Sequence, residues 1–157
     1  MYFVKTKLLG SRQILNYFIS YMDGDGSLKN VPGWNFTDWV PVWRRGTGPM
    51  AEDGSSALMD LQLLLALQSA VALEQTEGSE EFAELYSKLA TQLEKTIQDK
   101  YWDDARNIYA DTPLKDQFSQ HTNSLAILAG LVDGQQASEI GKTMLSDTAL
   151  APASIYF

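Results

Sequence analysis

Ala57-Leu58-Met59-Asp60-Leu61-Gln62-Leu63-Leu64-Leu65-Ala66-Leu67 is the most apolar stretch of this 157-residue chain. Its apolar residues recur nearly all the way round a helix, which we expect to run from a cap at Ser55 or Ser56 to about Thr76. A helix without a polar face is covered by other elements on most of its sides. The stretch therefore predicts an inner helix at the centre of a helical domain.

The helices that follow differ from it in a regular way. Residues 79–101, capped by Ser79, carry one apolar stripe opposite a charged face, and residues 135–145 do the same on a shorter scale. Residues 123–132 between them are again apolar nearly all round. The stripes are Phe82, Leu85, Tyr86, Leu89, Leu93 and Ile97, and then Ala137, Ile140, Met144 and Leu145. Alternating buried and one-sided helices indicate two concentric layers, so the fold class is all-α, part of an α/α toroid.

Two long irregular segments, 24–54 and 102–120, each precede a buried helix. We expect both at the same end of the layer, where loops build a site. The second segment includes a short extended pair around Ile108-Tyr109. A further helix is predicted over residues 3–21, with a weak point at Gly10-Ser11.

The first irregular segment contains Gly33-Trp34-Asn35-Phe36-Thr37-Asp38-Trp39-Val40-Pro41-Val42-Trp43. Three tryptophans, a phenylalanine and a carboxylate suit a sugar-binding surface, since sugar rings stack on aromatic faces and their hydroxyls donate to carboxylates. The alternative is a loop plug, in which the tryptophans bury apolar area under the domain. Composition alone leaves both interpretations open.

Composition excludes several other classes of function. The net charge of -8 disfavours nucleic acid and anionic membranes as partners. The chain has no cysteine and one histidine, which excludes thiolate chemistry and a histidine-rich metal site. The longest apolar run, 61–73, is expected to be too short for a membrane span, and residues 1–10 do not form a secretory signal. We expect a soluble chain whose compartment the sequence leaves open.

Five blocks, in order and at similar spacing, resemble the catalytic (α/α)6 barrel of bacterial α-L-rhamnosidases. They are Trp34-Asn35-Phe36-Thr37-Asp38-Trp39; Gly54–Ala57 with Asp60–Leu64; Lys100–Asp103; Tyr109–Thr112; and Phe118-Ser119-Gln120-His121-Thr122-Asn123-Ser124-Leu125. The first and last are the specific ones, and the helices between them match generically. The resemblance covers most of the chain and implies a partner, a rhamnose-containing glycoside or polysaccharide, and no cofactor.

Enzymes of this family are inverting glycosidases, which need a general-acid and a general-base carboxyl about 6.5–9.5 Å apart. The resemblance implies an acid in a D-R-D-E block before the matched region and a base in a T-T-x-x-E block after it, and the sequence contains neither block. A twelve-helix ring also needs well over 157 residues. We therefore expect residues 1–157 to be a single partial domain, an internal fragment without a catalytic residue, inactive alone.

The resemblance implies five substrate-binding candidates: Trp34, Asp38, Trp39, Trp43 and His121. The three tryptophans are not expected to line one pocket together, and Trp34 is the first choice for stacking on sugar. Asp38 either accepts hydrogen bonds from sugar hydroxyls or anchors the loop. His121 either bonds the loop or lies at the substrate rim. Asp103, Asp104 and Asp111 are interpreted as turn formers rather than partners of Asp38 in catalysis.

Two other functions stay open. One is a different helical-toroid glycosidase or glucuronyl hydrolase, which a second carboxylate close to Asp38 would favour. The other is a non-catalytic helical interaction module with Trp34 and Trp39 in its core. Half a toroid also leaves apolar helix faces uncovered, so we expect self-association, or burial of Leu64, Leu67 and Ile127 against another chain.

Overall fold

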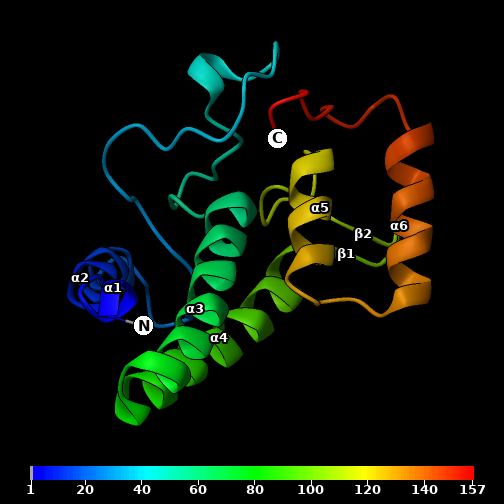
Figure 1. Ribbon diagram of the computed structural model, residues 1–157. Helices are drawn as coiled ribbons and strands as arrows, with labels where there is room; N and C mark the ends of the chain where they lie inside the picture. The colour runs from blue at the N-terminus through cyan, green and yellow to red at the C-terminus, as the bar shows by residue number, and fades with distance from the viewer. Residues whose placement is uncertain (1) are drawn as a thin grey trace.

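The computed structural model describes residues 2–157, and its regular secondary structure is helical apart from one short hairpin (Figure 1). The helices are α1 Tyr2–Lys5, α2 Leu8–Ile19, α3 Ala57–Glu77, α4 Glu80–Tyr101, α5 Gln120–Leu128 and α6 Gly134–Ser146, with one 3-10 turn, η1 Arg44–Gly46. The hairpin pairs β1 Trp102–Asp103 with β2 Ile108–Tyr109 in antiparallel register. Both the all-α prediction and the extended pair at Ile108-Tyr109 are confirmed.

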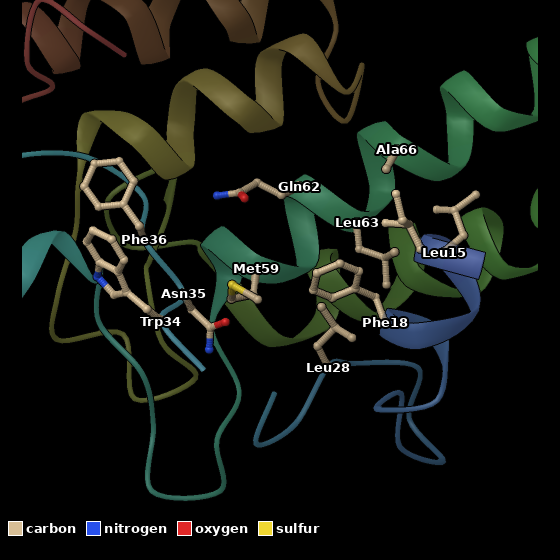
Figure 2. Close-up of a pocket in the computed structure, with 11 residues that line it drawn as sticks. Leu15, Phe18, Leu28, Trp34, Asn35, Phe36, Met59, Gln62, Leu63 and Ala66 are labelled. Carbon is tan, nitrogen blue, oxygen red and sulfur yellow. The ribbon is translucent and has the colours of Figure 1, made fainter. Parts of the chain in front are cut away.

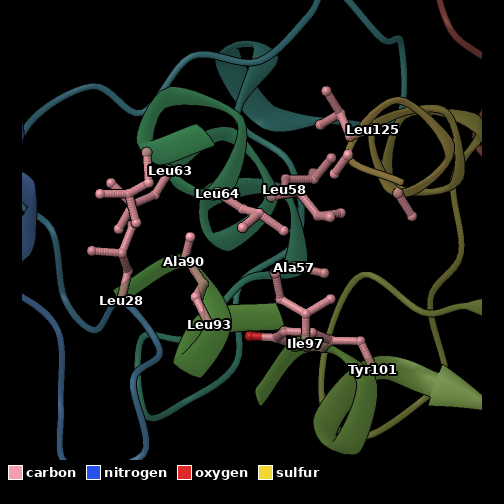
Figure 3. Packing of buried hydrophobic residues seen from close by; sticks show 14 of the residues in the cluster. Leu28, Ala57, Leu58, Leu63, Leu64, Ala90, Leu93, Ile97, Tyr101 and Leu125 are labelled. Carbon is pink, nitrogen blue, oxygen red and sulfur yellow. The ribbon is translucent and has the colours of Figure 1, made fainter. Parts of the chain in front are cut away.

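The core forms where α3 packs on α4, and Figure 3 shows their apolar side chains meeting there. Leu58, Leu61, Leu64 and Leu67 are at most 1% exposed, which confirms α3 as the inner helix. On α4, Tyr86, Leu93 and Ile97 of the stripe are buried, Phe82 and Leu89 are half-buried, and Leu85 at its edge is exposed. The α/α layering predicted from helix types is therefore present.

α5 and α6 form a second, smaller pair, and their faces are less covered than expected. Ala126 and Leu125 of α5 are buried, as is Ile140 of α6. The outermost apolar positions are exposed, Leu128 by 71% and Leu145 by 90%, so the prediction that Leu145 points inward is wrong. No other element among residues 2–157 packs over them, which is the physical reason.

Three local predictions also need correction. The N-terminal helix breaks at Thr6-Lys7 and continues through Gly10. Ser56 is the N-cap residue of α3, but its hydroxyl donates to the Pro49 carbonyl and accepts no hydrogen bond from a backbone amide of the helix. Ser79 makes no side-chain cap either.

The membrane argument from sequence also changes. α3 has 21 residues and is apolar enough to cross a membrane by length and composition, so the expected shortness of its apolar run is wrong. An inner helix of a helical domain meets the same criterion, and half of the apolar window in α3 is covered by the rest of the chain. Asp60 and Glu74 are also buried on this helix.

Burial within the chain bears on self-association as well. Leu64 and Leu67 are 0% exposed, because α4 and its neighbours already cover them. Ile127 is half-buried. The expectation that Leu64 and Leu67 are buried against a second chain is therefore wrong.

The two long loops meet at one end of the helical layer, as predicted. The amide of Ala57, the first residue of α3, donates to the carbonyl of Asp111 in the second loop at 3.0 Å. A parallel bridge between Ser119 and Ala151 brings the C-terminal segment to the same end. In Figure 1 the C-terminal segment and the first loop approach each other above α3 and α5.

Candidate functional site

Three aromatic side chains of the first loop form an exposed cluster at this end. The rings of Trp34, Phe36 and Trp39 contact one another at centroid distances of 5.3, 6.2 and 5.0 Å. Trp34 and Trp39 are each 59% exposed and Phe36 39%, so these rings do not plug the core. We call the three residues the aromatic wall.

The chain reversal at η1 holds the aromatic wall in place. The amides of Thr37 and Asp38 both donate to the Gly46 carbonyl, at 2.8 and 3.2 Å. Gly46 has φ +73°, and a Cβ there would lie 2.5 Å from the Phe36 ring. Only glycine fits this left-handed position and close contact. The Trp34 indole N–H donates to the Arg45 carbonyl at 3.0 Å, which fixes the remaining ring.

Trp43 has a different environment from the other two tryptophans of the stretch. It is 8% exposed, belongs to the main core, and its ring lies 4.4 Å from the ring of His121. The stretch thus contains both kinds of aromatic residue that the sequence left as alternatives. Trp34 and Trp39 face outward, while Trp43 is a core residue.

Asp38 lies behind the aromatic wall, 2% exposed, with both carboxylate oxygens hydrogen-bonded. Oδ1 accepts from the Trp39 amide at 2.7 Å and from the Ser154 hydroxyl at 2.5 Å. Oδ2 lies 2.7 Å from His121 Nε2 and accepts from the Ser154 amide at 2.7 Å. Burial opposes the charge, but the bonds from Ser154, His121 and Trp39 outweigh it and hold the pKa of Asp38 well below its ordinary value.

His121 is completely buried at the start of α5, between two aromatic rings. Trp43 lies on one side, and the Phe157 ring approaches edge-on at a centroid distance of 4.4 Å. Its Nε2 bonds Asp38, while Nδ1 has no hydrogen-bond partner among residues 2–157. The structure thus places His121 in contact with the loop carboxylate rather than at an exposed rim.

Asp111 is not the turn former that its sequence suggested. It is 1% exposed, and one carboxylate oxygen accepts from the hydroxyls of Ser119, at 2.6 Å, and Thr122. Burial raises the pKa of Asp111, against those two hydrogen bonds. Asp103 does act as expected, since it accepts from the Ala105 amide within its turn.

Asp60 is a further buried carboxylate, and sequence reasoning did not single it out. The amide of Leu28 and the hydroxyls of Ser27 and Tyr101 each donate to it at 2.7 Å. Burial raises the pKa of Asp60 to about 6, although the three donors favour the charged form. It connects the first loop to α3 and α4, so its role is structural.

Three hollows adjoin the aromatic wall, and one of them, of about 520 Å³, lies between Trp34 and the η1 residues Arg44 and Arg45. Each of the other two is lined by two rings of the wall. One, of about 570 Å³, is lined by Phe36, Thr37, Asp38, Trp39 and Tyr156. The other, of about 340 Å³, lies between α2, the loop and α3, and Figure 2 shows its largely apolar lining. Only the hollow beside Asp38 combines aromatic faces with a carboxylate, which is the combination that a sugar needs.

Sequence reasoning missed Ser154, the residue that contributes most donors to Asp38. Its partner lies 116 residues away, and no local pattern signals such a contact. It also left Phe36 out of the site candidates, although the W-x-F-x-D-W block contained it. Residues 2–157 hold no group of three or more side chains arranged to bind a metal ion.

The model of the bacterial alpha-L-rhamnosidase 6 hairpin glycosidase domain matches residues 10–155. Among solved structures, the GH78 family rhamnosidase of Bacillus sp. GL1 superposes with a TM-score of 0.77 at 24% identity, covering 96% of this chain and 16% of the other. The rhamnosidase from Klebsiella oxytoca with rhamnose bound gives 0.77 at 20% identity, covering 95% and 27%. The chain therefore spans about a sixth to a quarter of their lengths. No curated protein matches the sequence.

Proposed function

The chain belongs to the bacterial α-L-rhamnosidase six-hairpin glycosidase family, and on this premise we propose that it contributes the sugar-holding wall of a rhamnoside-cleaving helical barrel. The proposed substrate is a terminal rhamnose of a glycoside or polysaccharide. The observation that carries the proposal is the exposed aromatic wall at the end of the layer where both inner helices begin. Exposed indole rings that contact each other, instead of the core, are available for stacking on a sugar ring.

Within this proposal the five sequence candidates take two roles. Trp34 and Trp39 stack on the sugar, since they are the exposed tryptophans. Trp43 and His121 support the wall from the core, and Asp38 holds the two parts together. A direct sugar contact by Asp38 requires that one of its present donors be displaced.

We also propose that the chain alone does not hydrolyse rhamnosides. Inversion needs two available carboxyls about 6.5–9.5 Å apart on either side of the sugar. Near the wall, Asp38 already accepts four hydrogen bonds, and Asp111 is buried. Neither is free to protonate a leaving group or activate water.

Tryptophan fluorescence tests sugar binding directly. L-rhamnose should quench or shift the emission of the chain, and Trp34→Phe or Trp39→Phe should reduce that change. The matched control is Trp102→Phe, because Trp102 lies on β1 against Tyr109, outside the wall. An unchanged rhamnose response in both wall variants, or none in the original chain, contradicts the proposal. Turnover of an aryl α-L-rhamnoside above background, lost on Asp38→Asn, contradicts the inactivity.

The two alternative functions receive less support. A non-catalytic module with buried tryptophans fits poorly with Trp34 and Trp39 at 59% exposure. A different toroid glycosidase built around Asp38 needs a second carboxylate beside it, and the groups that bond Asp38 among residues 2–157 are Trp39, His121 and Ser154.

We propose that the chain self-associates through exposed apolar residues, and not through Leu64 and Leu67, which are buried within the chain. Ile14 is 63% exposed and Leu128 is 71% exposed. They belong to α2 and α5, which lie on opposite sides of α3 in Figure 1. In a closed ring of helical hairpins, each hairpin packs against the hairpin on either side of it. Exposed apolar residues there favour contact with a second copy.

A further inference from the structure

Arg44 and Arg45 are adjacent in the η1 turn, and both side chains are exposed. The other two arginines of the chain, Arg12 and Arg106, each pair with an acidic side chain and lie over a phenylalanine ring. Within residues 2–157, the guanidinium groups of Arg44 and Arg45 make neither kind of contact. These two adjacent positive charges are therefore available to a group from outside the described chain.

Both arginines line the hollow of about 520 Å³ beside the aromatic wall, together with Gly33, Trp34 and Thr47. Its volume lies in the range of small-molecule sites. Trp34 belongs to this hollow and to the wall, and its ring is exposed. A sugar that stacks on Trp34 therefore has a positively charged hollow beside it.

The backbone of the turn is joined to the wall. The carbonyl of Arg45 accepts the indole N–H of Trp34 at 3.0 Å, and the Thr47 amide donates to the Arg44 carbonyl at 3.2 Å. Arg45 has φ +57°, in the left-handed region that glycine adopts at lower cost than a residue with a side chain. The turn thus fixes where both arginine side chains leave the backbone, relative to the Trp34 ring.

The chemistry of these two side chains selects an anion. A guanidinium group is planar, stays charged, and can donate two parallel hydrogen bonds to a carboxylate. The chain as a whole has a net charge of -8, which repels anions, so a local pair of positive charges distinguishes this place from the rest of the surface. Beside a surface that stacks sugars, the matching anion is a carboxylate carried by a sugar.

We propose that the hollow binds the carboxylate of a uronic acid linked to the rhamnose, so that the preferred substrate is an acidic saccharide. The inference rests on the proposed function, because Trp34 must hold the rhamnose for its neighbour to reach Arg44 and Arg45. A neutral rhamnoside binds through the wall alone.

Isothermal titration calorimetry of the full chain separates the two contributions. The ligands are L-rhamnose, a disaccharide of terminal L-rhamnose on D-glucuronate, and the same disaccharide with D-glucose in place of D-glucuronate. The two disaccharides differ only at the carboxylate. Arg44→Gln and Arg45→Gln, alone and together, remove the positive charges of the hollow. The matched control is Lys142→Gln, which removes one charge from an exposed position on α6.

The glucuronate disaccharide should bind about tenfold more tightly than the glucose disaccharide, which is the effect of one hydrogen bond to a charged group. Each arginine variant should lower this preference and the double variant should abolish it, while the affinity for the glucose disaccharide stays the same. Lys142→Gln should leave the preference intact. Added salt should weaken it, because the charges are exposed.

Equal affinity for the two disaccharides in the original chain overturns the uronate site. So does a preference that the arginine variants leave intact, or that Lys142→Gln lowers as much as they do. Inorganic sulfate that binds as tightly as the glucuronate disaccharide also overturns it, since the hollow then accepts any anion. In each of these cases binding of L-rhamnose leaves the proposed function standing. No binding of L-rhamnose or of either disaccharide overturns both.

Discussion

Asp38 and His121 meet at 2.7 Å in the interior although 83 residues separate them in the chain. The contact joins the aromatic loop to the first turn of inner helix α5, so the wall is fastened to the helical layer behind it. Because both groups are buried, the loop cannot move away without leaving polar atoms unpaired.

Loss of the Asp38 carboxylate should destabilise the whole domain. Asp38→Ala leaves His121 Nε2 and the Trp39 amide without their acceptor, and we expect the free energy of unfolding to fall by about 3 kcal/mol. Urea denaturation measures it. Asp99→Ala is the control, since the ion pair of Asp99 with Lys95 is exposed and its loss should change stability by less than about 0.5 kcal/mol. Equal effects of the two substitutions would show that the Asp38–His121 contact is not structural.

Asp60 should make stability decrease with pH in a defined window. Its pKa is about 6 in the folded chain against an ordinary 3.8, so the folded state holds more protons between these values. Stability from this group is complete below pH 3.8 and lost as pH rises through 6, by about 3 kcal/mol in total. Denaturant unfolding from pH 4 to 7, compared with Asp60→Asn, isolates the effect from that of the other carboxylates. A parallel pH dependence in both proteins would contradict it.

The tryptophans of the loop should separate into two classes by stability. Trp43→Ala removes a core ring and should cost about 3–5 kcal/mol. Trp34→Ala removes a mostly exposed ring and should cost less than about 1 kcal/mol. Thermal or urea unfolding of the two variants checks this, and similar losses would place both rings in the core.

Gly46 should tolerate no side chain. Gly46→Ala combines a left-handed φ of +73° with a Cβ that meets the Phe36 ring at 2.5 Å. We expect a loss of about 2 kcal/mol and a weaker fluorescence response to rhamnose, because Phe36 must move. Gly10→Ala provides the control, since a Cβ there meets nothing within 4 Å and α2 should gain about 0.5–1 kcal/mol.

Self-association should depend on the exposed apolar residues of α2 and α5, Ile14 and Leu128. In sedimentation velocity we expect the average mass to rise with concentration, and Ile14→Lys to weaken that rise. Leu145→Lys changes a residue that is 90% exposed on outer helix α6 and should have no effect. A mass that stays at the monomer value at all concentrations, or equal effects of both variants, would contradict self-association through Ile14.

Much of the helical layer could be predicted from the sequence, because helix type is a local property. The apolar residues of 57–67 surround their helix and those of 82–97 lie on one side, so burial on all sides or on one side follows from periodicity alone. Errors occurred where neighbours decide burial. Leu145 continues an apolar stripe but projects into solvent, because nothing in the described chain packs beyond it.

For the candidate site, the sequence predicted which segment of the chain contributes to it but not which side chains of that segment are exposed. Periodicity carries no information within residues 33–43, so the sequence could not separate core Trp43 from exposed Trp34 and Trp39. It could not identify Ser154 as the partner of Asp38 either, since that pairing spans 116 residues.

The sequence by itself determined the helices, their alternation, the common end of the two loops and the family, because these depend on local periodicity and short ordered blocks of residues. The tertiary structure decided which rings form the aromatic wall and what occupies Asp38. Those features arise from long-range packing, in which residues far apart in the chain compete for the same buried volume and the same hydrogen-bond acceptors.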